Sequence, residues 1–271
     1  MKANRPAQTG RFCYNDGMKK KEKLIVGNWK LNPTDKETAK KIFVGVRQSS
    51  TKSKYSKTVI CPPFHYLSVL QPLIKGKKIA LGAQDVFWEN EGAFTGEISP
   101  VMLSKAGASY VIIGHSERRA MGETDEMVNR KVKAALKEGL RAIVCVGEKE
   151  RDVHGHYLEF LSAQIRNSLD KIQKKSLSEI VIAYEPVWAI GKKEALNGSL
   201  LYEMTLFVKK VISDIYGYDA GMNMSVLYGG SVTPANTEDI ISNGQVDGLL
   251  IGRQSLDPES FNEIITLIDQ L

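Results

Sequence analysis

Short apolar runs alternate with longer amphipathic stretches along the chain from residue 23 to its end. Each run has the length of a strand and each stretch has the apolar periodicity of a helix, so the pattern predicts repeated βα units on a parallel sheet. The predicted strands lie at 24–27, 58–61, 78–82, 110–113, 142–146, 181–184, 225–228 and 248–251. Eight βα units in about 250 residues predict an α/β protein built as one (β/α)8 barrel.

The barrel is expected to occupy residues 23–271 as a single domain, because no Pro- or Ser-rich linker interrupts the series. Residues 1–22 are polar and end in a cluster of lysines. We expect them to form an N-terminal extension that is disordered or partly derived from cloning, with Met18 resembling a natural start. A basic cluster of this size is more often a solvated terminus than a nucleic-acid site, so no nucleic-acid partner is expected.

The composition is that of an ordinary soluble globular protein, with 42% hydrophobic and 25% charged residues among 271. No window reaches the ~18 uninterrupted apolar residues of a membrane span, which argues against a membrane partner. Cys13, Cys61 and Cys145 are odd in number and far apart, so they favour a reducing cytoplasm over a disulfide framework. His154 and His156 have no third ligand in view, and no metal site is expected.

Glu185 follows an apolar run of strand length and is itself followed by Pro186. The run predicts a buried strand with a carboxylate at its carboxyl end, where barrels of this kind carry catalytic groups. The alternative is a solvated glutamate at an ordinary strand end. The next residues, 187–191, are apolar and are bounded by Pro186 and Gly191, which favours a lid that covers a site over a simple connection.

Two further polar groups directly follow predicted strands and are expected at the same mouth of the barrel. Lys30 follows the first strand in the motif GNWK at 27–30, and His115 follows the fourth in GHSERR at 114–119. The alternatives are a surface lysine and a structural histidine. A helix that starts at His115 would favour the neutral imidazole, which can donate a hydrogen bond to a carbonyl oxygen.

These three segments closely resemble motifs of the triosephosphate isomerase family, and the likeness extends over nearly all of residues 23–271. The resemblance implies a catalytic TIM barrel that interconverts dihydroxyacetone phosphate and D-glyceraldehyde 3-phosphate through an enediolate, without metal or organic cofactor. A glutamate base with a neutral histidine is the known arrangement of this family. The residues implied are Glu185 as the base, His115 as the hydrogen-bond donor, Lys30 as the cation facing the substrate, Asn28 as a polar contact and Glu117 as the neighbour of Lys30.

Glycines after the last two predicted strands indicate a phosphate site, because backbone N–H groups can approach an anion there. The turns read GGS at 229–231 and Gly252-Arg253. The resemblance implies that the phosphate is bound by backbone N–H groups of Gly191, Ser231, Gly252 and Arg253.

Two places depart from the family pattern, and both touch the expected phosphate site. The lid reads GKK at 191–193 where Gly-Thr-Gly is common, and the turn after the eighth strand reads Gly252-Arg253 where Gly-Gly is usual. We expect the flexible Arg253 side chain to point to solvent while its backbone N–H meets the phosphate. Replacing Arg253 with glycine would then change kcat/KM by less than about tenfold.

Residues 84–98 form a long predicted connection with aromatic residues at 87, 88 and 94. Loops longer than ~12 residues in a compact domain are usually functional, and exposed aromatic residues indicate an interface. The alternative is a loop folded back onto its own barrel. The segment 92–97 resembles the interlocking loop of the family, which docks beside a neighbour's active site, and therefore implies a homodimer.

Two other functions fit parts of the pattern. A phosphate cradle alone is shared by many barrels that act on other phosphorylated metabolites. A catalytically silent phosphate-binding or scaffold barrel would show the same glycine turns. The joint presence of Lys30, His115 and Glu185 argues against both, and an assay of glyceraldehyde 3-phosphate isomerisation separates the three hypotheses.

Overall fold

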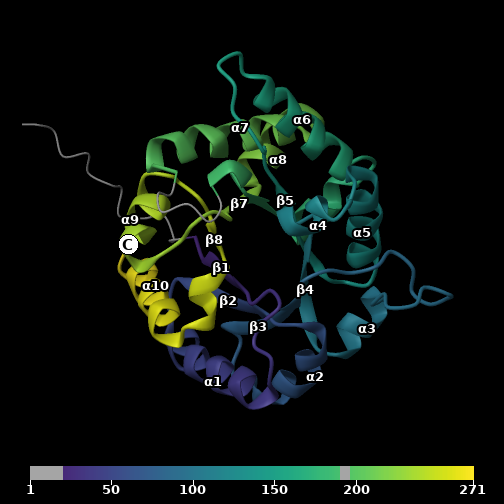
Figure 1. The fold of residues 1–271 in the computed structure, drawn as a ribbon. Helices are drawn as coiled ribbons and strands as arrows, with labels where there is room; N and C mark the ends of the chain where they lie inside the picture. Colours follow the sequence, from purple (N-terminus) through teal and green to yellow (C-terminus); the bar gives the residue numbers. More distant parts are fainter. Residues whose placement is uncertain (1–20, 190–195) are drawn as a thin grey trace, which may run out of the picture.

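The computed structural model describes residues 21–189 and 196–271, which form a closed barrel of parallel strands surrounded by helices (Figure 1). Neighbouring strands pair in chain order, and the last closes against the first. The strands are β1 (Lys23–Asn28), β2 (Ser56–Cys61), β3 (Ile79–Ala83), β4 (Ala108–Ile113), β5 (Arg141–Val146), β6 (Ile180–Tyr184), β7 (Ser225–Tyr228) and β8 (Gly248–Ile251). The predicted (β/α)8 TIM barrel is confirmed, while residues 1–20 of the expected N-terminal extension lie outside the described residues.

Observed strand ends agree with the predicted ones to within two residues. The largest differences are at the starts of β2 and β4, where Ser56 and Ala108 extend the strand beyond the apolar run. β3 begins and ends one residue later than predicted, and the ammonium of Lys78, just before it, bonds to Glu22 and to the Lys54 carbonyl. The apolar pattern therefore locates the buried part of each strand rather than its first paired residue.

Helices follow the strands around the outside of the barrel. The α-helices are α1 (Lys36–Lys52), α2 (Leu67–Leu70), α3 (Pro100–Lys105), α4 (Ser116–Ala120), α5 (Asp125–Lys137), α6 (His156–Ser168), α7 (Gly198–Tyr216), α8 (Tyr218–Asn223), α9 (Pro234–Ser242) and α10 (Pro258–Gln270). Short 3-10 helices are η1 (Phe64–Tyr66), η2 (Gln71–Leu73), η3 (Lys174–Glu179), η4 (Val187–Ala189) and η5 (Arg253–Leu256). Several α-helices begin after a side chain that accepts a backbone N–H, as Asp35, Thr124 and Asn197 do for α1, α5 and α7.

The strands are buried on both faces, which explains why they read as continuous apolar runs. Along β1, Val26 belongs to the core inside the barrel, whereas Ile25 packs in the larger core between strands and helices. The same division separates Val181 from Ile182 in β6. Lys30, His115 and Glu185 lie beyond the ends of these strands. Among the described residues, no helix is long and apolar enough to span a bilayer.

Candidate active site

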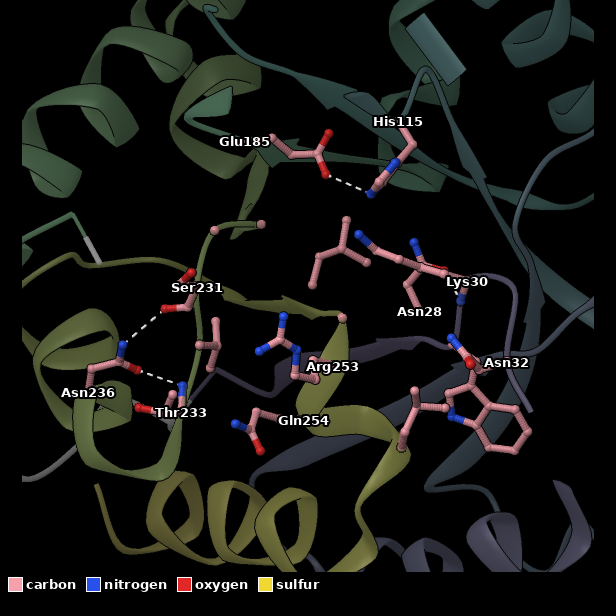
Figure 2. A pocket seen from close by; sticks show the side chains of 17 residues that line it. Asn28, Lys30, Asn32, His115, Glu185, Ser231, Thr233, Asn236, Arg253 and Gln254 are labelled. Atoms are coloured by element: carbon pink, nitrogen blue, oxygen red, sulfur yellow. Dashed lines mark hydrogen bonds and ion pairs between the residues drawn. The ribbon is translucent and has the colours of Figure 1, made fainter. Parts of the chain in front are cut away.

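The three predicted catalytic groups line one cavity at the carboxyl ends of the strands (Figure 2). Lys30 follows β1, His115 follows β4 and Glu185 follows β6. The cavity has a volume of about 510 Å³. Parallel strands of a barrel end at the same mouth, so residues far apart in the sequence meet there.

Glu185 is buried, with only 2% of its surface exposed, and its carboxylate faces two polar groups. Its Oε2 accepts a hydrogen bond of 2.9 Å from the Ser116 N–H, and its Oε1 lies 3.1 Å from His115 Nε2. Burial raises the pKa of the Glu185 carboxyl, while His115, the Ser116 N–H and Lys30 offset part of that rise. A carboxylate with a raised pKa is a stronger proton acceptor than a solvated one.

The hydrogen bonds around its ring assign His115 to the neutral form. The Glu117 N–H donates to Nδ1 at 3.2 Å, so Nδ1 is the acceptor nitrogen and carries no proton. The proton of the neutral ring then lies on Nε2, the nitrogen that faces Glu185. His115 immediately precedes α4, and the start of that helix supplies the N–H that determines the tautomer. The ring can therefore donate from Nε2 to an oxygen in the cavity.

Lys30 has a φ of 53°, a left-handed conformation that residues with side chains seldom adopt. Such a conformation costs on the order of 1–3 kcal/mol and persists where the surroundings fix it. Asn28 Oδ1 accepts a hydrogen bond from the Lys30 N–H at 3.0 Å, and Gln84 Nε2 donates to the Lys30 carbonyl at 2.9 Å. Asn28, predicted as a substrate contact, thus also holds the Lys30 backbone, and Gln84 is a supporting residue that the sequence did not reveal.

The Lys30 ammonium pairs with Glu117 at 2.5 Å. Their side chains are 34% and 53% exposed, so water screens the pair and its contribution to stability is small. The contact instead fixes where the ammonium lies at the edge of the cavity. Glu117 is therefore placed beside Lys30, as the resemblance implied.

Glycines form the opposite side of the cavity, where the phosphate turns were predicted. Gly229 and Ser231 follow β7, Gly252 follows β8, and all three line the cavity. A Cβ atom on Gly229 would lie 2.8 Å from Glu185 Cγ, so this glycine leaves room for the carboxylate side chain. Gly191, which was predicted to bind the phosphate together with Ser231, Gly252 and Arg253, lies outside the described residues.

The Arg253 side chain is directed into the cavity, and the expectation that it points away is wrong. Figure 2 shows its guanidinium group in the space between Ser231 and Asn28. The physical reason is the path of the chain, because η5 begins at Arg253, two residues after the end of β8, and its first residue therefore lies at the mouth where the cavity is. In the part of the chain that the structure describes, positive φ among non-glycine residues occurs at Lys30, Lys171 and Gln245, so Arg253 carries no such strain.

Asn236 lines the cavity beside the glycine turns and was not predicted as a site residue. Its Nδ2 donates to the Ser231 carbonyl at 2.9 Å, and its Oδ1 accepts from the Thr233 N–H at 2.8 Å (Figure 2). The sequence carries a signal for this residue, since Thr233 and Asn236 form the capping box of α9. That signal predicts a helix start and does not reveal that the cap also holds Ser231.

Glu148 anchors the beginning of the predicted lid. Its Oε1 accepts hydrogen bonds from the Tyr184 hydroxyl at 2.8 Å, the Trp188 Nε1 at 2.8 Å and the Arg151 Nε at 2.9 Å. Trp188 belongs to η4, the first turn after Pro186. The remainder of the predicted lid, 190–195, lies outside the described residues. The described start of this segment is therefore tied to the end of β6 through one buried carboxylate.

Comparisons with known proteins bear on the family of this chain. The family model described as triosephosphate isomerase matches residues 23–268. The triosephosphate isomerase of Dictyoglomus thermophilum is 44% identical over 247 residues, which cover 90% of this chain and 99% of that protein. The one from Roseiflexus castenholzii is 43% identical over 245 residues, covering 89% of this chain and 96% of its own.

A solved structure gives the same result. The crystal structure of triosephosphate isomerase from Bartonella henselae has a TM-score of 0.78 and 37% sequence identity, and the match covers 90% of this chain and 97% of that one. Family model, relatives and structure thus agree over almost the whole barrel, and the chain belongs to the triosephosphate isomerase family.

Proposed function

We propose that Glu185, His115 and Lys30 are the catalytic residues of this chain. As a member of the triosephosphate isomerase family, the chain interconverts dihydroxyacetone phosphate and D-glyceraldehyde 3-phosphate. The Glu185 carboxylate removes a proton from one carbon of the substrate and returns it to the adjacent carbon. One observation supports this assignment: the buried Glu185 carboxylate lies 3.1 Å from His115 Nε2, and both residues line the same cavity as Lys30.

The enediolate formed between the two proton transfers needs stabilisation of its oxygens. The His115 Nε2–H faces the cavity and, once substrate displaces its contact with Glu185, donates to the substrate oxygen. The Lys30 ammonium supplies positive charge at the edge of the same cavity. Fixed donors of this kind act most strongly where charge develops, because they need no reorganisation during the reaction. The reaction moves hydrogen within one molecule, so we propose no cofactor.

The substrate phosphate is proposed to bind at the glycine turns after β7 and β8. Ser231 and Gly252 line the cavity there, and their backbone N–H groups are the proposed ligands together with those of Arg253 and Gly191. The capping role of Asn236 supports this proposal, because it holds the Ser231 backbone through its carbonyl. A phosphate bound at these turns leaves the triose carbons toward Glu185 and His115.

A coupled assay that follows glyceraldehyde 3-phosphate formed from dihydroxyacetone phosphate tests the function directly. We expect turnover without added metal or organic cofactor. Binding of the substrate without turnover would instead support a silent phosphate-binding or scaffold barrel. Turnover of a different phosphorylated metabolite alone would show that the cradle serves another reaction.

Replacing Gly229 with alanine is expected to lower kcat by about tenfold. The added Cβ would lie 2.8 Å from Glu185 Cγ, and the carboxylate must move by a few tenths of an ångström to accommodate it. Because a misplacement of ~1 Å can cost ~100-fold, a smaller shift is expected to cost less.

The matched control is Gly45→Ala in α1, whose Cβ would lie 2.9 Å from Pro258 Cβ, away from the cavity. Steady-state kinetics and thermal melting should show that Gly45→Ala lowers stability with kcat unchanged. Equal kcat for Gly229→Ala and the unmodified protein would contradict the proposed position of the base.

We also propose that the chain forms a homodimer through residues 84–98. Figure 1 shows the segment between β3 and α3 projecting from the barrel, and its residues 89–97 are exposed. Phe94 is 43% exposed and Leu31, next to Lys30, is 91% exposed, so both offer apolar surface to a partner. Gln84, at the start of the segment, donates to the Lys30 carbonyl and would couple dimer formation to the site.

Placing charge on the loop is expected to dissociate the dimer. A Phe94→Glu, Thr95→Glu double variant would bury unpaired charge in the proposed interface, which is strongly unfavourable. We expect the mass measured by light scattering to halve and the activity to fall with it. Val153→Glu, at a residue that is 96% exposed and outside this segment, should change neither. A loop variant with full mass and full activity would rule out this interface.

A cytoplasmic location is proposed as well. Cys61 and Cys145 are both free and buried, which agrees with a reducing compartment.

A further inference from the structure

Arg253 occupies a position from which a side chain can reach a bound phosphate. It begins η5, directly after Gly252, and lines the same cavity as Ser231. Its guanidinium group is directed into the space between Ser231 and Asn28 (Figure 2). The residue is exposed, so the side chain stays in contact with the solvent that fills the cavity. Glu185 and His115, which line the same cavity, are buried, whereas Arg253 is exposed.

The charge of Arg253 has no protein partner among the described residues. The other arginines of the described ranges 21–189 and 196–271 all bond to a carbonyl, a hydroxyl or a carboxylate. Examples are Arg119 with Asp125 and Arg151 with Glu148. No ion pair or hydrogen bond within those ranges involves the Arg253 side chain. As far as the described residues go, its guanidinium donors are therefore available to an anion in the cavity.

Lys30 is a second cation close to the turn at Gly252. A Cβ atom on Gly252 would be 3.9 Å from Lys30 Nζ, so the Lys30 ammonium lies close to the residue that precedes Arg253. The two cations thus reach the cavity from adjacent elements, β1 and η5. A dianion held between them would be attracted from two directions, which is more favourable than attraction by Lys30 alone.

The guanidinium group is well suited to this task. It presents several N–H donors in a planar fork that matches two phosphate oxygens, and charge-assisted bonds of this kind are stronger than neutral ones. Gly252, which precedes Arg253, has φ −85° and ψ −103°. Because it has no side chain, it still leaves room for a ligand to approach the backbone of the turn. Arg253 therefore adds a side-chain contact, while Gly252 remains the glycine that lies against Lys30.

We propose that the Arg253 guanidinium is a direct ligand of the substrate phosphate and makes the site more selective for phosphorylated substrates. The inference rests on the proposed function for the identity of the substrate, and it adds a side-chain contact to the backbone contacts proposed above. It predicts that removal of the guanidinium weakens phosphate binding while the chemistry at the triose carbons continues.

The test compares Arg253→Gln and Arg253→Gly with Lys77→Gln, which removes one exposed charge at the amino end of β3, opposite the cavity. Inorganic phosphate is the probe, and its binding is measured by calorimetry and by competitive inhibition. We expect both Arg253 variants to bind phosphate at least about tenfold more weakly, which corresponds to ~1.4 kcal/mol, and to raise KM similarly with kcat within about threefold. Lys77→Gln should match the unmodified protein.

Glyceraldehyde without a phosphate provides the substrate control. Its slow isomerisation should proceed equally in Arg253→Gln and in the unmodified protein, because the proposed contact is then absent from both. Unchanged phosphate binding in the Arg253 variants would overturn the inference, as would an equal loss with glyceraldehyde, since that result would indicate disturbed chemistry. Phosphate binding is measured without turnover, so an inactive unmodified protein would refute the proposed function and leave this measurement valid.

Discussion

Replacing Glu185 with glutamine is expected to lower kcat by about a thousandfold and, at neutral pH, to raise the stability of the fold. A general base contributes roughly 10²–10⁴-fold, and an amide cannot accept the substrate proton. The remaining donors, His115 and Lys30, still stabilise a bound enediolate but cannot generate it. The loss should therefore appear in kcat, with substrate binding much less affected.

The gain in stability follows from the buried charge. Burial raises the pKa of Glu185 in the folded protein above its value of about 4.3 in an unfolded chain, so the folded state holds the proton more tightly. The contribution of Glu185 to stability is then fully present below the unfolded pKa and is lost as the pH rises through the folded pKa. Glutamine does not titrate and escapes this loss. The difference in Tm between variant and unmodified protein should be largest near neutral pH, shrink as the pH falls through the raised folded pKa toward about 4.3, and stay constant below that.

Glu185→Asp is the matched control, because it keeps the charge and shortens the side chain by one methylene. We expect it to lose roughly 100-fold in kcat through misplacement of the carboxylate. It should show no gain in Tm at neutral pH. A glutamine variant that is no more stable than the unmodified protein near neutral pH would show that Ser116 and His115 fully compensate for burial of the charge. Full turnover by either variant would remove Glu185 from the mechanism.

Much of the fold could be predicted because the strands are buried on both faces. Such strands appear as uninterrupted apolar runs, and eight of them separated by helical periodicity leave few alternatives to a barrel. The strand starts could not be predicted as well. Ser56 and Ala108 join the sheet by pairing with Lys23 of β1 and Leu81 of β3, which depends on the neighbouring strand and not on the local apolar run.

The residues of the site also differ in how well the sequence predicts them. Lys30, His115 and Glu185 directly follow strands, so the architecture alone brings them to one mouth. Gln84 and Asn236 act by bonding the backbone of residues on other segments, and that contact exists only once the barrel has closed. The direction of Arg253 was predicted wrongly because it depends on the path of η5 across the cavity, which the adjacent sequence does not determine.

Replacing His115 with glutamine is the second change with a large expected effect, and it should lower kcat by about 100-fold while KM changes only a few-fold. The Nε2–H bond to the substrate oxygen strengthens as negative charge develops, and the loss of one such donor typically costs roughly 10²–10³ in kcat. Glutamine also lacks the acceptor nitrogen that receives the Glu117 N–H, so its amide is not oriented toward the cavity as the imidazole is.

His156→Gln provides the control for His115→Gln, since the His156 side chain is 71% exposed and pairs with Asp152 outside the cavity. Its kinetics should equal those of the unmodified protein. Steady-state rates at saturating substrate, measured in both reaction directions, separate kcat from KM. If His115→Gln raised KM and left kcat unchanged, His115 would serve to position the substrate, and stabilisation of the enediolate would have to come from Lys30 alone.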